Sequence, residues 1–434
     1  MTTKINAARA ALSHVHEVMK LAFAFELWDG STIPADAERG AGQLFVRIAD
    51  PGVISALIRR PKLDTIVDLW VTRRVDLLGG SLFDFAAKRP QGKTSKLVKQ
   101  LSKARLARHL LPFVFGSSGP VSSRTRSDEG ARDGSEETNR RNIQHHYDVS
   151  NAFYALFLDE AMLYTCAYFT DWSNSIDQAQ RDKLDMICRK LRLKAGDRLL
   201  DIGCGWGALI CHAAEHHGVI AHGVTLSEEQ FIKGKARITE RGLSDRVTIE
   251  MKDFAKLTGT YTKISSIGMF EHVGLANHQT YFQTVKRLLA PRGLYLHHAI
   301  TRPGKATEAK FNRKPAEYQA ILKNIFPGAE LDHIGMSLRN LEANGFEVHD
   351  VEGWREHYAL TTEHWAKRLM ANETAAIREV GEETYRMWIA YLVGVSLGFR
   401  RGSIEIFQTV ASRKDKGPSG LPPTRADLYT LPRG

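Results

Sequence analysis

The sequence predicts a doubly wound α/β domain over residues 139–434, joined by a linker to a small α+β domain over residues 1–115. Two observations support this prediction. After Asn139, short apolar strands alternate with helices, as in a mainly parallel sheet with helices on both faces. Before it, residues 116–138 are rich in Gly, Ser and charge and contain Val121 as their one sizeable apolar residue, so we expect a flexible linker.

In the N-terminal domain, residues 43–48 and 65–71 are expected to form strands. The domain holds 18 Lys and Arg against 10 Asp and Glu, so most of the chain's net charge of +11 lies in it. One stretch without acids contains eight of the basic residues: Lys88, Arg89, Lys93, Lys96, Lys99, Lys103, Arg105 and Arg108. At helical spacing, residues 93–103 predict one basic amphipathic helix, with the apolar face Leu97, Leu101 and Ala104. Such a helix suits an anionic membrane surface, or it is a solvated helix of its own domain.

The composition narrows the possible partners and compartment. The positive charge fits nucleic acid, an anionic membrane or an acidic small molecule. The four cysteines form no C-x-x-C pair, and neither they nor the histidines have the spacing of a metal site, so no metal is expected. Without a signal peptide or a run of about 18 apolar residues, a cytoplasmic protein with reduced thiols is expected.

In the C-terminal domain, residues 178–193 are predicted to form a helix with Leu184, Ile187, Cys188 and Leu191 on one stripe. The predicted strands are residues 198–202, 219–225, 247–251, 264–269 and 294–300. Helical stretches at residues 317–325 and 363–368 are expected to be lid insertions that cover a long apolar tunnel.

A glycine-rich loop at residues 201–207, DIGCGWG, runs from the first predicted strand into a helix. Its glycines let the backbone approach a ligand closely and place amides at a helix N-terminus. The spacing also satisfies the dinucleotide fingerprint, but that class needs an acid at the end of the second strand to bind a ribose. The second strand ends instead in Thr225-Leu226-Ser227, and Asp253 closes the third. This arrangement favours an S-adenosylmethionine enzyme of the Rossmann-like class.

Six motifs then occur in order: residues 146–148 (HYD), 164–169 (YTCAYF), 201–207 (DIGCGWG), 223–230 (GVTLSEEQ), 269–274 (MFEHVG) and 296–300 (LHHAI). Together they resemble the cyclopropane-fatty-acid synthase family, which includes the mycolic acid cyclopropane synthases. The resemblance covers roughly residues 139–413, whereas the N-terminal domain matches the phospholipid-acting branch only in length and basic character. It implies a Rossmann-like methyltransferase that adds one carbon from S-adenosylmethionine to the double bond of acyl chains in membrane phospholipids.

The resemblance also implies site residues. The expected cofactor contacts are Tyr164, Thr165, Asp201, Gly203, Gly205, Gly207, Thr225, Leu226, Ser227, Gln230, Asp253 and Phe254. A bicarbonate ion would be held by Cys166, Glu271, His298, the backbone of Ile300, and Tyr358. Thr165 stands where serine is usual, and His297 stands where leucine is common. Neighbours on a strand face opposite sides, so only one of the two histidines can face the site, and we choose His298 because Ile300 shares its face.

The chemistry explains these residue types. An internal alkene is a poor nucleophile, so transfer depends on aligning the sulfonium methyl group with the double bond. The resulting carbocation needs aromatic faces, for which Tyr147, Tyr168 and Phe169 are candidates. A base then removes a proton from the new methyl group so that the ring closes, and this base is bicarbonate, or Glu271 if no ion is bound. Cys166 is not expected to act as a nucleophile.

Two other functions fit the sequence, and a third is disfavoured. The same site could give a methyl-branched or methylene-bearing chain, because the fate of one proton decides the product. A small-molecule methyltransferase with a basic arm is a second possibility. A nucleic-acid methyltransferase is disfavoured, because no basic groove interleaved with aromatic residues is visible. The expected partners are thus membrane phospholipids and no nucleic acid, at the inner face of the membrane, with a homodimer implied by resemblance alone.

Overall fold

The computed structural model describes residues 2–40, 42–90, 94–120, 122, 149–315, 318–319 and 329–429. The chain forms two compact units: Met1–Arg126 with Val380–Val393, and Ser127–Glu379 with Gly394–Gly434. Residues 380–393, which the sequence assigns to the C-terminal domain, join the N-terminal unit. They do so because Arg386 pairs with Asp76 at 2.9 Å and its guanidinium lies 3.8 Å from the ring centre of Trp70. Of the predicted linker, only residues 116–120 and 122 are described.

The N-terminal unit contains a four-stranded sheet in the order β2-β1-β3-β4, in which only β1 and β3 are parallel. Its strands are β1 (Ala24–Glu26), β2 (Thr32–Ile33), β3 (Phe45–Ile48) and β4 (Val75–Leu78). Its helices are α1 (Thr2–Met19), α2 (Gly52–Arg59), α3 (Leu63–Val71), α4 (Leu82–Ala87), α5 (Thr94–Gln100) and α6 (Lys103–Val114). Apolar residues from helices and sheet form one core, in which Ala8, Leu44, Val53 and Phe113 are fully buried.

Two predictions for this unit are wrong. Residues 65–71 form most of helix α3 and not a strand, because Thr65 and Leu69, four residues apart, are buried on one helical face. The β-branched composition that indicates a strand is overridden by this tertiary packing. From residue 94 on, the basic stretch is two helices and not one, since Ser102 lies between α5 and α6 and its hydroxyl accepts a hydrogen bond from the Arg105 amide as the N-cap of α6. Lys93 lies outside the described residues.

The C-terminal unit is built on a seven-stranded sheet in the order β10-β11-β9-β8-β5-β6-β7. The strands are β5 (Arg198–Ile202), β6 (Ile220–Thr225), β7 (Val247–Met251), β8 (Tyr261–Ile267), β9 (Leu289–Thr301), β10 (Phe346–Gly353) and β11 (Glu405–Arg413). Strands β5 to β9 are parallel, whereas β11 runs antiparallel to both β9 and β10. The five predicted strands are all present, two of them with the predicted bounds.

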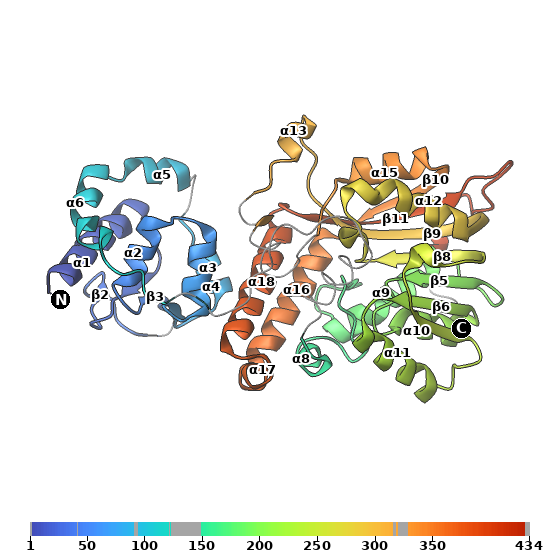
Figure 1. Cartoon of the computed structure of the whole chain (residues 1–434), viewed down its shortest axis with the longest axis horizontal. Helices are drawn as coiled ribbons and strands as arrows, with labels where there is room; N and C mark the ends of the chain where they lie inside the picture. Colours follow the sequence, from blue (N-terminus) through green and yellow to red (C-terminus); the bar gives the residue numbers. More distant parts are fainter. Residues whose placement is uncertain are drawn as a thin grey trace. The chain divides into compact units, whose positions relative to one another are not determined.

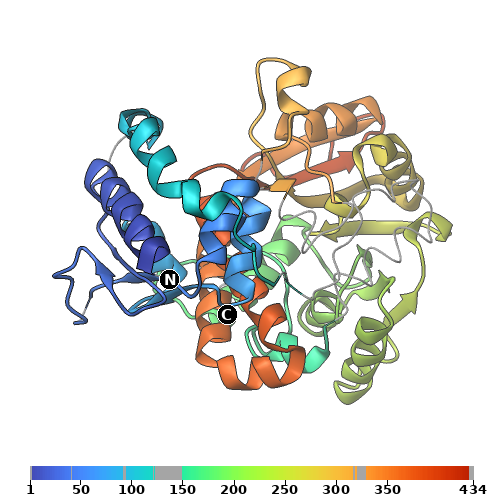
Figure 2. The same ribbon diagram turned by 60° about the vertical axis from the view of Figure 1, so that its left-hand side comes forward.

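Helices cover both faces of this sheet, as Figure 1 and Figure 2 show, so the predicted doubly wound α/β class is confirmed. Residues of α9 (Ile176–Lys190), α10 (Ala208–His217) and α11 (Glu228–Glu240) pack with one face. Residues of α12 (His278–Leu288) and α15 (Ile334–Ala343) pack with the other. The remaining helices are α8 (Asn151–Ala155), α13 (Glu308–Phe311), α16 (Arg355–Ala371), α17 (Glu373–Val380), α18 (Glu382–Arg400) and α19 (Ala426–Tyr429).

The two segments predicted to be lid insertions are residues 317–325 and 363–368. Residues 363–368 lie in α16, where Trp365 and Leu369 are buried. Residues 317–325 lie outside the described part of the chain, except for 318 and 319. No helix among the described residues is long and apolar enough to cross a membrane.

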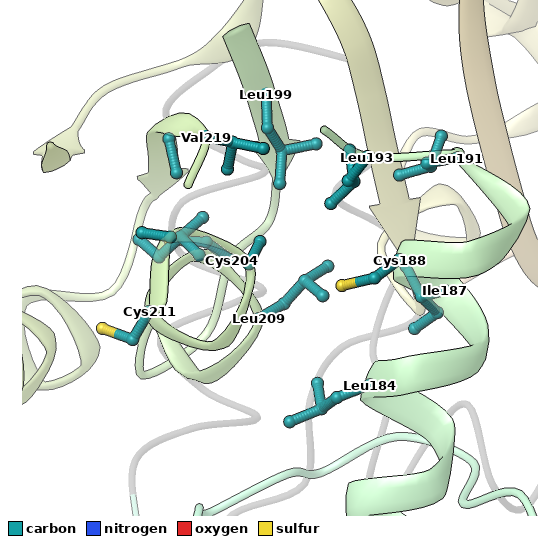
Figure 3. Packing of buried hydrophobic residues seen from close by; sticks show 14 of the residues in the cluster. Leu184, Ile187, Cys188, Leu191, Leu193, Leu199, Cys204, Leu209, Cys211 and Val219 are labelled. Carbon is teal, nitrogen blue, oxygen red and sulfur yellow. The ribbon is translucent and has the colours of Figure 1, made fainter. Parts of the chain in front are cut away.

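The core on the α9 side of the sheet confirms the predicted stripe. Leu184, Ile187, Cys188 and Leu191 are all buried there. Figure 3 shows the side chain of Leu209, on α10, directed toward Cys188 on α9. Cysteines 188, 204 and 211 all belong to this core and are free thiols.

Leu199 on β5 is fully buried in the same core and does not line the pocket described below. We expect Leu199→Ala to lower the free energy of unfolding by about 2–5 kcal/mol, because it leaves a cavity in a packed core. Urea denaturation followed by tryptophan fluorescence measures this. The matched control is Ile232→Ala, since Ile232 is 55% exposed on α11, and its effect should stay within about 0.5 kcal/mol. Equal effects of the two substitutions would contradict the assignment of this core.

Candidate active site

A pocket of about 270 Å³ lies at the carboxyl ends of β5, β6 and β8. Ligands of doubly wound sheets bind at this edge. Ten of the predicted cofactor residues line it: Tyr164, Thr165, Asp201, Gly203, Gly205, Thr225, Leu226, Gln230, Asp253 and Phe254. The other two, Gly207 and Ser227, are not among the lining residues and are the N-caps of α10 and α11.

The glycine loop has the backbone that its composition predicts. Gly203, Gly205 and Gly207 have φ values of +79°, +54° and +77°, in the left-handed region that favours glycine. A Cβ at Gly203 would also come within 2.9 Å of Met269, whereas nothing lies within 4 Å of one at Gly205. The loop therefore leaves open space beside Gly205, where the backbone lines the pocket.

The end of β6 is held by side-chain hydrogen bonds. The Thr225 hydroxyl donates to Gln230 Oε1 at 2.8 Å and accepts from the Ser227 amide at 3.2 Å. Ser227 in turn caps α11 by accepting from the Gln230 amide. Asp253 follows β7 and accepts from the Ala255 amide at 2.8 Å. These contacts fix the pocket wall that the sequence assigns to the cofactor.

A buried lysine, missed by the sequence prediction, also lines the pocket. Lys183 on α9 is 1% exposed, and its Nζ donates to Thr165 Oγ1 at 2.8 Å. Burial lowers the pKa of Lys183 to about 8, against the opposing charges of Asp159 and Asp201. Burial likewise raises the pKa of Asp201 to about 6, and Ser265 Oγ donates to that carboxylate at 2.7 Å. Because an ammonium group only donates, the Thr165 hydroxyl accepts from Lys183 and can direct its own proton into the pocket.

Next to this pocket, β8 ends at Ile267 while β9 continues. The Gly268 amide bonds to the His298 carbonyl at 2.9 Å, and beyond it Glu271 Oε1 accepts from the Ile300 amide at 2.6 Å. Glu271 is 6% exposed, and burial raises its pKa to about 7. Its second oxygen, Oε2, is buried without a hydrogen-bond partner among the described residues. A buried carboxylate oxygen of this kind is costly, so it indicates a site for a polar ligand.

His298 presents a second such atom. Its Nδ1 is hydrogen-bonded to Gln408 Nε2 at 2.9 Å, and its ring meets Trp354 edge-on at 5.3 Å. Its Nε2 is buried and has no partner in the part of the chain that the structure describes. Burial, together with the charges of Lys183 and Lys190, holds the pKa of His298 well below its ordinary value, so the ring is neutral.

His297 lies on the opposite face of β9. Its Nδ1 is 3.0 Å from the Tyr295 hydroxyl, and its ring packs against Phe270 and Phe282 in the α12-side core. Strand alternation thus separates the two histidines, with His298 on the α9 side.

Cys166 and Tyr358 are connected through Trp354. The Trp354 carbonyl accepts from Cys166 Sγ at 3.9 Å and from the Tyr358 amide at 3.0 Å. The Tyr358 ring packs against Trp365 at 6.1 Å, and Trp365 packs against the pocket residue Tyr164 at 5.1 Å. Burial raises the pKa of Cys166 well above its ordinary value, so it remains a thiol and a weak nucleophile.

Two of the three predicted cation-stabilising aromatics, Tyr168 and Phe169, are described, and neither lines the pocket. Tyr168 packs against Trp354 at 4.8 Å and stacks on His357 at 4.9 Å, while Phe169 stacks on His357 at 6.2 Å. Tyr147, with the motif of residues 146–148, lies outside the described residues.

Other pocket residues were not predicted, among them Trp206, Met269, His272 and Tyr281. Burial lowers the pKa of His272 to about 4. The sequence did carry one signal for the buried lysines: Lys183 and Lys190 lie two turns apart, beside the apolar stripe of α9. Within the described ranges, no group of His, Cys, Asp and Glu side chains could hold a metal ion.

Known proteins that are similar to this chain indicate its family. The family model for mycolic acid cyclopropane synthetase matches residues 134–409. A Pseudomonas putida protein named "Probable fatty acid methyltransferase" is 35% identical over 423 residues, 96% of this chain and 98% of that protein. The cyclopropane-fatty-acyl-phospholipid synthase of Escherichia coli K12 is 38% identical over 268 residues, 62% of this chain and 66% of that protein.

Among solved structures, mycolic acid cyclopropane synthase CmaA1 complexed with SAH and CTAB superposes with a TM-score of 0.59 and 33% identity. The match covers 66% of this chain and all of that one. The pocket at the strand ends, the glycine loop and the family match lead to one conclusion: the chain belongs to the cyclopropane synthase family of S-adenosylmethionine-dependent methyltransferases.

Proposed function

We propose that this enzyme is a cyclopropane-fatty-acyl-phospholipid synthase, which adds a methylene group from S-adenosylmethionine to the cis double bond of an acyl chain. The observation that supports it most directly is that Glu271 Oε2 and His298 Nε2 are both buried without a hydrogen-bond partner among the described residues. Neither residue lines the cofactor pocket itself, but Met269 and His272, close to Glu271 in the chain, do. Methylating an alkene leaves a cation whose ring closure requires removal of one proton. A buried carboxylate with a raised pKa is suited to proton transfer near neutral pH.

The chain's own residues supply positioning and exclusion of water. Bound S-adenosylmethionine would supply the electrophilic methyl group, with the glycine loop, Thr165 and Asp253 holding it. Tyr164 lines the pocket and its ring packs against Trp365 at 5.1 Å, and an aromatic face of this kind can stabilise a cation. The neutral Cys166 thiol likewise does not compete for it.

The residues also fit bicarbonate. Glu271 can accept a hydrogen bond from the ion, and neutral His298 and Tyr358 can donate to its oxygens. This fit rests on the buried atoms Glu271 Oε2 and His298 Nε2, which have no hydrogen-bond partner among the described residues, and on the donors His298 and Tyr358. Bound bicarbonate would supply the base for ring closure.

A second product class has specific support. The relative that matches nearly the whole chain is named a fatty acid methyltransferase, and its name specifies no ring. A methyl-branched or methylene-bearing chain would arise from the same cation if a different proton were lost.

The direct test is incubation with vesicles of monounsaturated phospholipid and labelled S-adenosylmethionine, followed by mass spectrometry of the lipids. We expect a gain of one CH₂ per modified chain and an NMR signature of a cyclopropane ring. A branch in place of the ring would reassign the product, and no gain on any lipid would overturn the proposal.

The raised pKa of Glu271 predicts a pH dependence. Because the carboxylate must be ionised to accept a proton, turnover should rise as pH increases through about 7 and then level off. Glu271→Gln should lower kcat by about 10²–10⁴-fold and remove this rise. The affinity of the Glu271→Gln variant for S-adenosylmethionine, measured by calorimetry, should equal that of the wild type. An unaltered pH profile in the variant would assign the ionisation to another group.

The exposed lysines of α5 and α6 predict binding to anionic membranes. A triple substitution to Glu at Lys96, Lys99 and Lys103 should weaken co-sedimentation with phosphatidylglycerol vesicles about tenfold or more. Each basic group near such a surface contributes about 1 kcal/mol of binding free energy. The control replaces three exposed lysines of the C-terminal unit, Lys235, Lys414 and Lys416, in the same way. Equal losses in the two variants would show a general charge effect and not a membrane-binding surface.

A further inference from the structure

A row of polar side chains crosses the buried α9 side of the sheet. His298 on β9 lies directly opposite Gln408 on β11, and Gln408 lies directly opposite Glu352 on β10. Side chains of directly opposed residues in antiparallel strands project from the same face, about 4.5–5.5 Å apart at Cβ. The register therefore brings these three side chains together without any loop.

Lys190, in the last turn of α9, completes the row. Its Nζ donates to Gln408 Oε1 at 2.8 Å and forms an ion pair with Glu352. Lys190 and Gln408 are 0% exposed and His298 is 1% exposed, so water does not compete for these hydrogen bonds. The order of contacts is Glu352, Lys190, Gln408, His298.

This order determines where the proton of His298 resides. A lysine ammonium has donors and no acceptor, so the amide oxygen of Gln408 must face Lys190 and its NH₂ group must face His298. The NH₂ group, which donates to Nδ1 at 2.9 Å, requires that Nδ1 be unprotonated. A neutral imidazole with an unprotonated Nδ1 carries its proton on Nε2.

We propose that Lys190 and Gln408 are positioning residues that fix the Nε2–H tautomer of His298, so that its buried Nε2 donates a hydrogen bond into the active site. This inference rests on the proposed function in placing His298 at that site. With the opposite tautomer, Nε2 would be an acceptor and would repel the oxygen of an anion or of the Glu271 carboxylate. Lys190 and Gln408 thus determine whether His298 Nε2 is a donor or an acceptor, without contacting the substrate themselves.

The test reads the tautomer directly. Long-range ¹H–¹⁵N correlation spectra of the full-length protein, labelled at its 17 histidines, distinguish protonated from unprotonated ring nitrogens, and the signals that vanish in His298→Asn identify His298. In the wild type we expect Nε2 protonated and Nδ1 unprotonated from pH 6 to 8. A proton on Nδ1 in the wild type would overturn the inference without any appeal to a variant.

Gln408→Glu is the sharpest variant, because it keeps the shape of the side chain and the pairing with Lys190 but turns the donor facing Nδ1 into an acceptor. We expect a proton on Nδ1 of His298, and kcat lowered about 10²-fold, as for loss of an oriented donor, with KM for S-adenosylmethionine unchanged. The pH profile of kcat should also gain a titration that the wild type lacks. Unfolding midpoints and cofactor affinity confirm that the variant is folded.

The matched control is Gln279→Glu, which introduces the same charge at an exposed position on α12. It should leave the tautomer and kcat unchanged. If Gln408→Glu lowered stability alone, with Nδ1 still unprotonated and the pH profile unaltered, the row would be merely structural. The tautomer is read without lipid, so a failure of the proposed lipid reaction would be recognised separately.

Discussion

Helix α9 packs on the sheet through a face that carries two buried ammonium groups, and the arrangement of the active site follows from how those charges are satisfied. A buried lysine without partners costs several kcal/mol of stability. Lys183 donates to Thr165 in the neighbourhood of Asp159 and Asp201, and Lys190 pairs with Glu352 and donates to Gln408. One helix thereby orients a hydroxyl at the cofactor pocket and an imidazole beside it.

The second constraint is a difference in strand length. Strand β8 stops at Ile267, whereas its neighbour β9 runs on to Thr301. The unpaired edge of β9 needs an acceptor for the Ile300 amide, and Glu271 provides it from the loop after β8. The carboxylate is therefore held at the carboxyl end of the sheet, with its second oxygen buried and without a hydrogen-bond partner among the described residues. The hydrogen bond between the Ile300 amide and Glu271 thus both satisfies the edge of β9 and positions the carboxylate.

The two units of the chain are matched by different sets of known proteins. The family model matches residues 134–409, whereas the Pseudomonas putida relative matches 96% of the chain and so includes residues of both units. All the predicted site residues lie within residues 134–409, whereas the basic α5 and α6 lie outside that range.

Local sequence determined the strands that lead into the site, the glycine loop and most of the pocket wall, because strand periodicity and left-handed glycines are properties of neighbouring residues. It could not place Lys183 and Lys190, whose burial depends on partners such as Thr165, Glu352 and Gln408 on other elements. It also misassigned residues 65–71, since packing of Leu69 decided between helix and strand. Only the tertiary structure fixed the pairing across β9, β10 and β11, because the free energy of a buried polar group depends on which distant residue faces it.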